Sequence, residues 1–176
     1  DPQVPGGADI STLTQKEVSD RAGYDVPRLE DAIALTQDLD QSFCWNLELK
    51  TLDSFVVALQ TVKQQKPSTA IMFTSFWHDG IMEMIRDSPR QFSYGLLWAS
   101  HPYKFQAPQW FEAHQQITTL VFHQERLSKP LVQQCHQKNK QIWAYGDRTD
   151  ADRSRLKRWG INTLISDRPD LLVRER

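Results

Sequence analysis

The sequence predicts one α/β domain built around a parallel sheet, and three features of the 176-residue chain support this. Apolar runs of roughly five to eight residues, typical of strands, alternate with helical stretches of about ten residues, which is the pattern of repeated βα units. The strand-like runs are apolar at both odd and even positions, as expected when helices cover one face of a sheet and a core covers the other. Because no low-complexity segment or interdomain linker interrupts the pattern, we interpret residues 1–176 as a single domain.

The predicted elements follow a turn-rich opening at residues 1–9. Pro27 suits the start of the first helix, Ser54 is a suitable N-cap for the second, and Gly160 is expected to end the last. Six strands are predicted, at residues 42–50, 69–76, 92–98, 117–123, 141–146 and 161–166. Helices are predicted at residues 26–37, 54–65, 108–115, 128–139 and 149–160, with a short one through Ile81, Met84 and Ile85.

The charge of the chain gives little support for a polyanionic partner. The formal net charge is −1, which favours neither nucleic acid nor an anionic membrane as a partner. The basic run at residues 153–158 follows Asp147, Asp150 and Asp152, so we interpret it as a solvated helix face. No stretch approaches the roughly 18 apolar residues of a membrane span.

Cys44 and Cys135 are the two cysteines, and their spacing is not that of a metal site. Both lie in apolar patterns, so they are predicted to be buried free thiols, which favours a reducing compartment. A cytoplasmic location is the resulting expectation, with a periplasmic or secreted location as the alternative.

Functional groups in parallel α/β folds collect at the carboxyl ends of the strands. This rule gives the following candidates in chain order: Glu48, Lys50, Ser75, Phe76, Trp98, His123, Trp143, Tyr145, Ser166 and Asp167. His123 could be a base or a metal ligand, or a structural histidine. Trp143 could be a platform for a sugar or glycerol, or a core residue.

Glu48 and Lys50 are the most informative of these candidates because they share strand parity and leave the same face. On a barrel lumen they would lie side by side at its mouth. A carboxylate there suits a divalent metal, and an ammonium group suits an anion such as phosphate. The alternative interpretation is an ion pair at the rim of the sheet.

Several motifs, taken in order, resemble the glycerophosphodiester phosphodiesterase family. They are "VPRLEDAIAL" before the first predicted strand, "NLELK" on that strand, "TSFWHDGIMEMI" on and after the second, and the long ending "QIWAYGDRTDADRSRLKRWGINTLISDRPDLL". The resemblance implies a TIM-type (β/α)8 barrel of the phosphodiesterase superfamily, with strands three to eight in view. It also implies hydrolysis of small-molecule glycerophosphodiesters to glycerol 3-phosphate and an alcohol, with a divalent cation (Mg or Ca), as part of lipid and glycerol metabolism.

The resemblance also assigns roles to single residues. Glu48 matches the third metal carboxylate, and Lys50 the cation that neutralises the phosphate. Ser75 and Phe76 match a Ser-Phe strand end that contributes to substrate binding, and Trp143 matches an active-site tryptophan. Glu48 and Lys50 are therefore the expected catalytic residues, and Glu48 the expected metal ligand.

The family's first two strands, with their His-Arg, Glu-x-Asp and His-Asp motifs, have no counterpart in this sequence, and Asp1 matches the Asp of His-Asp. We therefore expect the metal to be weakly held or absent, and the chain alone to be inactive. A missing N-terminal segment or a partner would be needed to close the barrel. Two alternatives remain open: a non-catalytic binding or scaffold protein derived from the barrel, and a phospholipase-C-like enzyme that releases a cyclic phosphate.

Overall fold

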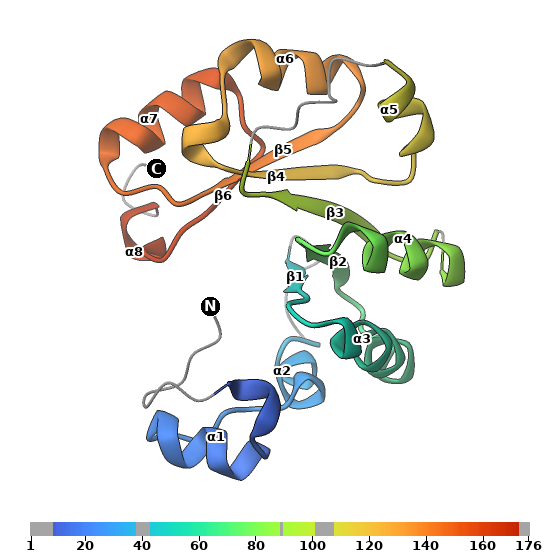
Figure 1. The fold of residues 1–176 in the computed structure, drawn as a ribbon. Helices are drawn as coiled ribbons and strands as arrows, with labels where there is room; N and C mark the ends of the chain where they lie inside the picture. The colour runs from blue at the N-terminus through green and yellow to red at the C-terminus, as the bar shows by residue number, and fades with distance from the viewer. Residues whose placement is uncertain (1–8, 38–42, 89, 101–107, 173–176) are drawn as a thin grey trace.

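The computed structural model describes residues 9–37, 43–88, 90–100 and 108–172, and its centre is a six-stranded sheet (Figure 1). The strands are β1 (Cys44–Glu48), β2 (Ala70–Ser75), β3 (Ser93–Trp98), β4 (Thr119–His123), β5 (Gln141–Tyr145) and β6 (Thr163–Ile165). They pair in chain order, and each pair is parallel. The predicted parallel α/β fold and its six strands are therefore confirmed.

Helices connect the strands and lie on the outer face of the curled sheet (Figure 1). Parallel strands need such crossovers, since a short turn cannot join the end of one strand to the start of the next. The connecting helices are α3 (Leu52–Gln65), α4 (His78–Asp87), α5 (Pro108–Ala113), α6 (Lys129–Gln137) and α7 (Asp150–Trp159). Before β1 lie α1 (Gln15–Ala22) and α2 (Leu29–Leu35), and after β6 lies α8 (Pro169–Leu172). Single 3-10 turns occur at Ile10–Thr12 and Gln124–Arg126.

Three helix starts differ from the prediction. Helix α2 begins at Leu29 with Arg28 as its N-cap, so Pro27 precedes the helix instead of starting it. Helix α1 was not predicted, although Thr14 and Glu17 form a capping box whose spacing is visible in the sequence. Helix α3 begins at Leu52 with Thr51 as its N-cap, so the predicted Ser54 cap is wrong. Ser54 instead lies inside the first turn and donates its hydroxyl to the Thr51 carbonyl at 2.6 Å. The prediction that α7 ends at Gly160 is confirmed, since Gly160 adopts φ +85°.

The alternation of side chains along the strands divides the buried residues into two clusters. The larger cluster lies between the sheet and the helices, and Phe73, Leu120 and Ile142 are fully buried within it. The smaller one lies on the concave face, which we call the lumen, and consists of Met72, Leu97, Val121 and Trp143. The two faces of the sheet are therefore both apolar at mid-strand, as the sequence predicted.

Two predictions about burial are wrong. Cys135 is buried as expected, but Cys44 is exposed, because it starts a terminal strand of the described sheet on the lumen face, below the small apolar cluster. The basic run of α7 is not a uniformly solvated face. Arg153 is only 8% exposed, and its guanidinium donates to Asp147 at 2.8 Å and also contacts Asp150.

Lys140 stabilises the end of the barrel opposite the carboxyl ends of the strands. Its ammonium group is buried just before β5 and donates to the carbonyl oxygens of Ile117 at 2.6 Å and His114 at 2.8 Å. Burial lowers the pKa of Lys140. The ammonium therefore satisfies the buried Ile117 carbonyl in the loop after α5, and it shares the His114 carbonyl with the Ile117 backbone N–H.

We predict that Lys140→Met destabilises the fold by about 1–3 kcal/mol, because it keeps the apolar stem but leaves the buried Ile117 carbonyl without its donor. Chemical denaturation monitored by circular dichroism measures the change. Lys138→Met is the matched control, since Lys138 is exposed two residues earlier and should shift the midpoint very little. Equal midpoint shifts in the two variants would show that the hydrogen bonds of Lys140 do not stabilise the fold.

Candidate active site at the carboxyl ends of the strands

A cleft of about 280 Å³ opens at the carboxyl ends of the strands, on the lumen side. Its lining comes from the ends of β1, β2, β3, β5 and β6, so segments far apart in the sequence meet there. The lining residues are Glu48, Lys50, Phe76, Leu97, Tyr145, Gly146, Asp147, Ile165 and Asp167. This position is where parallel barrels carry their functional groups.

Glu48 and Lys50 form the charged wall of this cleft. The Lys50 ammonium lies 2.7 Å from the Glu48 carboxylate, and the side chains are 49% and 31% exposed respectively. Leu49, between them, points to the opposite face and is buried against the helices. Both charged side chains therefore lie on the lumen side, as strand parity predicted. In this structure they also form the rim ion pair that was the alternative interpretation.

Ser75 holds the backbone from which Lys50 projects. Its buried hydroxyl donates to the Leu49 carbonyl at 2.6 Å and accepts from the Trp77 backbone N–H at 3.0 Å. The Trp77 indole N–H then donates to the Lys50 carbonyl at 3.3 Å. Ser75 therefore faces the ends of β1 and β2, outside the cleft lining, and its predicted role in substrate binding stays a prediction.

Phe76 and Trp143 have different positions relative to the cleft. Phe76 lines it and makes an edge contact with Tyr145, with ring centroids 6.3 Å apart. Trp143 lies in the small apolar cluster of the lumen, and its indole N–H donates to the Gln141 side chain at 3.2 Å. Its indole is buried and is not among the cleft-lining residues, so its role as a substrate platform stays a prediction.

Tyr145 brings a phenol into the cleft opposite Glu48. Burial raises the pKa of Tyr145, and the nearby negative charge of Glu48 raises it further. The phenol therefore stays protonated at neutral pH and can donate a hydrogen bond. Its present acceptor is the Trp98 carbonyl at 3.4 Å, a long contact that a better acceptor in the cleft could replace.

His123 supports Tyr145 from the neighbouring strand. Their rings meet edge to face with centroids 5.2 Å apart, and the His123 Nδ1 accepts from the Glu125 backbone N–H at 3.4 Å. Gly146 adopts φ +80°, and a Cβ there would lie 2.5 Å from the His123 ring. Gly146 is therefore needed both for its backbone conformation and for the close approach of His123.

Asp147 ties the ends of β5 and β6 to α7. Its side chain is 1% exposed, and one carboxylate oxygen accepts from Arg153 at 2.8 Å and from the Ser166 hydroxyl at 3.2 Å. In the sequence, Asp147 stands out only as part of a charged run. Its position directly after the Gly146 turn, at a strand's carboxyl end, is the signal that could have identified it as part of the cleft wall.

The described residues do not form a complete site for a divalent cation. Hard cations take several oxygen ligands, and no group of three or more His, Cys, Asp or Glu side chains in the described part of the chain is placed to hold one. Glu48, Asp147 and Asp167 line the same cleft, but Asp147 is bound to Arg153. The role of Glu48 as a metal ligand stays a prediction.

Comparison with known proteins identifies the family of this chain. A model of the glycerophosphoryl diester phosphodiesterase family matches residues 8–171. The chain belongs to this family. The resemblance inferred from the motifs is therefore confirmed, and the chain is classed with the glycerophosphodiester phosphodiesterases. No curated protein matches the sequence.

Solved structures agree with the family assignment at the level of the fold. A putative glycerophosphodiester phosphodiesterase from Galdieria sulphuraria matches with a TM-score of 0.81 and 18% identity, over 98% of this chain and 75% of its own. A phosphodiesterase from Oleispira antarctica, in complex with the product sn-glycerol-3-phosphate, gives a TM-score of 0.81 and 18% identity, over 98% and 74%. A glycerophosphodiester phosphodiesterase from Thermotoga maritima gives 0.72 and 17%, over 100% and 77%. The six-stranded curled sheet thus corresponds to part of a TIM-type barrel.

The lengths and polarity of the helices were compared with those of a membrane span. Within the described ranges, every helix is too short or too polar to cross a bilayer. Asp1, which the motif comparison placed next to a catalytic histidine, lies outside the described residues.

We predict that Asp147→Asn destabilises the protein by about 1–3 kcal/mol, because it weakens a charge-assisted hydrogen bond to the buried Arg153, whose second partner Asp150 remains. Asp170→Asn is the matched control. Asp170 also binds an arginine, Arg168, but both side chains are more than half exposed, so the loss of this ion pair should lower the stability far less. Thermal unfolding of both variants measures the two losses. An equal loss of stability in the Asp170 and Asp147 variants would contradict the stabilising role of the buried Asp147–Arg153 pair.

We predict that Tyr145 ionises above its ordinary pKa of 10.0 and that Glu48→Gln moves this ionisation toward lower pH. Burial is the larger cause, so a raised pKa should persist in the variant. The difference in phenolate absorbance between each protein and its Tyr145→Phe counterpart isolates this one tyrosine. Since the folded-state pKa is raised, Tyr145 should cost folding stability as the pH rises above 10.0. An unchanged titration in the Glu48 variant would place the two side chains too far apart to interact.

Proposed function

We propose that this protein hydrolyses glycerophosphodiesters to glycerol 3-phosphate and an alcohol, in a reaction that depends on a divalent cation, and that residues 1–176 need a further segment or a partner to supply the remaining catalytic groups. The observation that carries the proposal is the Glu48–Lys50 pair at the lumen mouth, in a cleft of a family member. The phosphodiesterase from Oleispira antarctica, solved with sn-glycerol-3-phosphate, supports this product for a protein of the same fold.

Lys50 is proposed to bind the phosphate. Its pairing with Glu48 is partly exposed, and such pairs contribute roughly 0–1 kcal/mol, so replacing the carboxylate with a phosphate oxygen costs little. Its backbone is fixed by Ser75 and Trp77, which reduces the reorganisation needed when the phosphate arrives. A preorganised cation stabilises the charge that develops on the phosphate oxygens in the transition state.

Tyr145 is proposed to donate a hydrogen bond from the opposite side of the cleft, since its raised pKa keeps the phenol protonated. Hydrolysis forms a bond from the phosphorus to a water oxygen and breaks the bond to the alcohol oxygen, which leaves with a proton. The groups that carry these protons are proposed to lie outside the described lining of the cleft. Glu48 would supply one carboxylate to the cation, whose charge offsets that of the phosphate.

A second candidate function is a non-catalytic module that binds glycerophosphodiesters. The lack of a three-ligand metal cluster in the described part of the chain favours this reading. It predicts binding of glycerol 3-phosphate through Lys50, without turnover at any concentration of Mg²⁺ or Ca²⁺.

We predict that Lys50→Met lowers the rate of glycerol 3-phosphate release from glycerophosphoethanolamine by about 10²–10³-fold, the usual loss for one preorganised charge-stabilising group. Glu48→Gln should remove the part of the rate that Mg²⁺ or Ca²⁺ stimulates. An enzyme-coupled assay for glycerol 3-phosphate measures both effects, with Lys138→Met as the control for a change of one charge.

Three results would redirect the proposal. Full activity of the Lys50 variant would remove Lys50 from the reaction. Release of a cyclic phosphate, detected by phosphorus NMR, would indicate a phospholipase-C-like reaction. Binding of glycerol 3-phosphate by calorimetry without turnover would support the non-catalytic module.

A further inference from the structure

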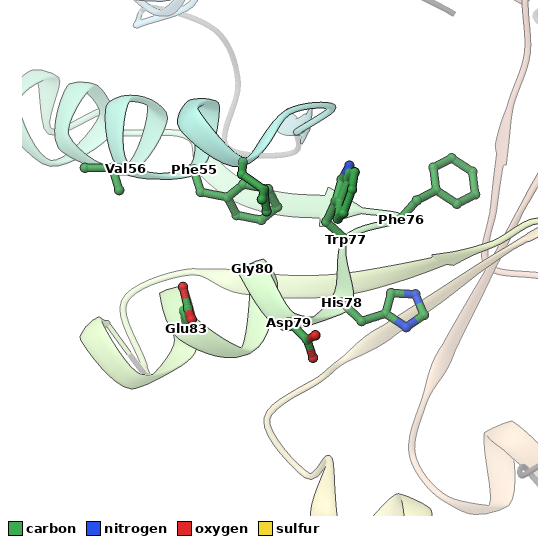
Figure 2. Close-up of a pocket in the computed structure, with 9 residues that line it drawn as sticks. Phe55, Val56, Phe76, Trp77, His78, Asp79, Gly80 and Glu83 are labelled. Atoms are coloured by element: carbon green, nitrogen blue, oxygen red, sulfur yellow. The ribbon is translucent and has the colours of Figure 1, made fainter.

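A second, larger depression adjoins the cleft on its outer side. It has a volume of about 570 Å³ and lies between the N-terminal halves of α3 and α4 (Figure 2). We call it the apolar groove. Four of its lining side chains, Leu52, Val56, Phe76 and Trp77, are 45–61% exposed.

These four side chains are half of the eight large exposed hydrophobic residues in the described part of the chain. Single exposed hydrophobic residues need no explanation, but a cluster of them in one depression is typical of a binding surface. The volume of the groove also falls in the range of small-molecule sites.

The floor of the groove is formed by a close contact between α3 and α4. Phe55 packs from α3 against Gly80 of α4, and a Cβ on Gly80 would lie 2.6 Å from the Phe55 ring. Glycine at this position therefore allows the two helices to approach around the aromatic ring. Figure 2 shows Trp77 between Phe55 and Phe76, while the polar side chains of Asp79 and Glu83 come from the α4 side.

The groove is continuous with the candidate active site through two residues. Phe76 lines both the groove and the cleft that holds Glu48 and Lys50. Trp77, the next residue, donates its indole N–H to the Lys50 carbonyl at 3.3 Å. A ligand whose phosphate is bound at Lys50 would therefore have an apolar surface next to it.

The cleft and the apolar groove differ in chemistry. This difference indicates which half of a diester would bind in each of them. The cleft offers the Asp167 carboxylate and the Tyr145 phenol, which suit the hydroxyl groups of glycerol. The groove offers aliphatic and aromatic side chains. Resting on the proposed function, we propose that the preferred substrates are glycerophosphodiesters whose alcohol carries an alkyl chain, and that this chain lies in the apolar groove.

The test uses two ligands that cannot be hydrolysed at the alcohol side, because a P–C bond replaces the P–O bond. They are the glyceryl esters of ethylphosphonic and octylphosphonic acid, and calorimetry measures their dissociation constants in the presence of Mg²⁺ or Ca²⁺. Burying several additional methylene groups should make the octyl compound bind about tenfold tighter or more. Val56→Asp should remove most of this gain and leave the affinity for the ethyl compound unchanged.

Val57→Asp is the matched control. Val57 is the next residue of α3 and is 62% exposed, close to the 61% of Val56, but it does not line the groove. The Val57→Asp variant should therefore still bind the octyl compound more tightly than the ethyl compound. Equal binding of the two ligands by the wild-type protein, or an equal loss of the gain in both variants, would overturn the inference.

Two further measurements distinguish a failure of this inference from a failure of the proposed function and from membrane binding. If neither phosphonate nor glycerol 3-phosphate binds, the proposed function fails, whereas binding of the ethyl compound without a gain for octyl overturns only the assignment of the groove. Co-sedimentation with phosphatidylcholine vesicles that depends on Val56, without discrimination between the two soluble ligands, would assign the groove to a membrane surface and overturn the alkyl-chain proposal.

Discussion

The alternation of side chains across the curled parallel sheet is the constraint on which the rest of the structure depends. Successive residues of a strand face opposite sides, so Glu48 and Lys50 project into the lumen while Leu49 is buried against the helices. A shift of one residue would bury both charges and expose Leu49, at a cost of several kcal/mol for each unpaired ion. The parallel register of β1 on β2, Glu48 beside Thr74, thus fixes the core and the candidate site together.

The cleft remains ordered because polar groups outside it restrain the strand ends. Ser75 joins the end of β1 to the turn after β2, and Asp147 joins the ends of β5 and β6 to Arg153 of α7. Gly146 permits both the left-handed turn and the approach of His123. Each restraint joins groups from neighbouring βα units, so the geometry of the cleft depends on the assembled sheet. This is the structural reason why functional residues in such folds are far apart in sequence.

The sequence predicted the strands, most of the helices and the position of the cleft because these depend on local patterns. Periodicity separates strands from helices, and parity places Glu48 and Lys50 without knowledge of the neighbours. The burial of Arg153 and the exposure of Cys44 were missed because each depends on tertiary partners that periodicity does not reveal. Arg153 lies in a run that is basic in sequence, yet its charge is matched by Asp147 in the loop between β5 and α7. The role of Ser75 as a backbone clamp was also unpredictable, since parity alone does not identify a hydrogen-bond acceptor on the adjacent strand.

The charge balance of the cleft supports the proposed need for a cation. Its lining includes the carboxylates of Glu48, Asp147 and Asp167 and the single ammonium of Lys50. Arg153 compensates Asp147, which leaves two carboxylates facing one ammonium, and a phosphodiester would add a further negative charge. Like charges in a partly desolvated cleft repel one another. The negative charge that Lys50 leaves unbalanced is the physical basis for proposing a cation at this site. A divalent cation that shares Glu48 would offset this charge where the diester enters.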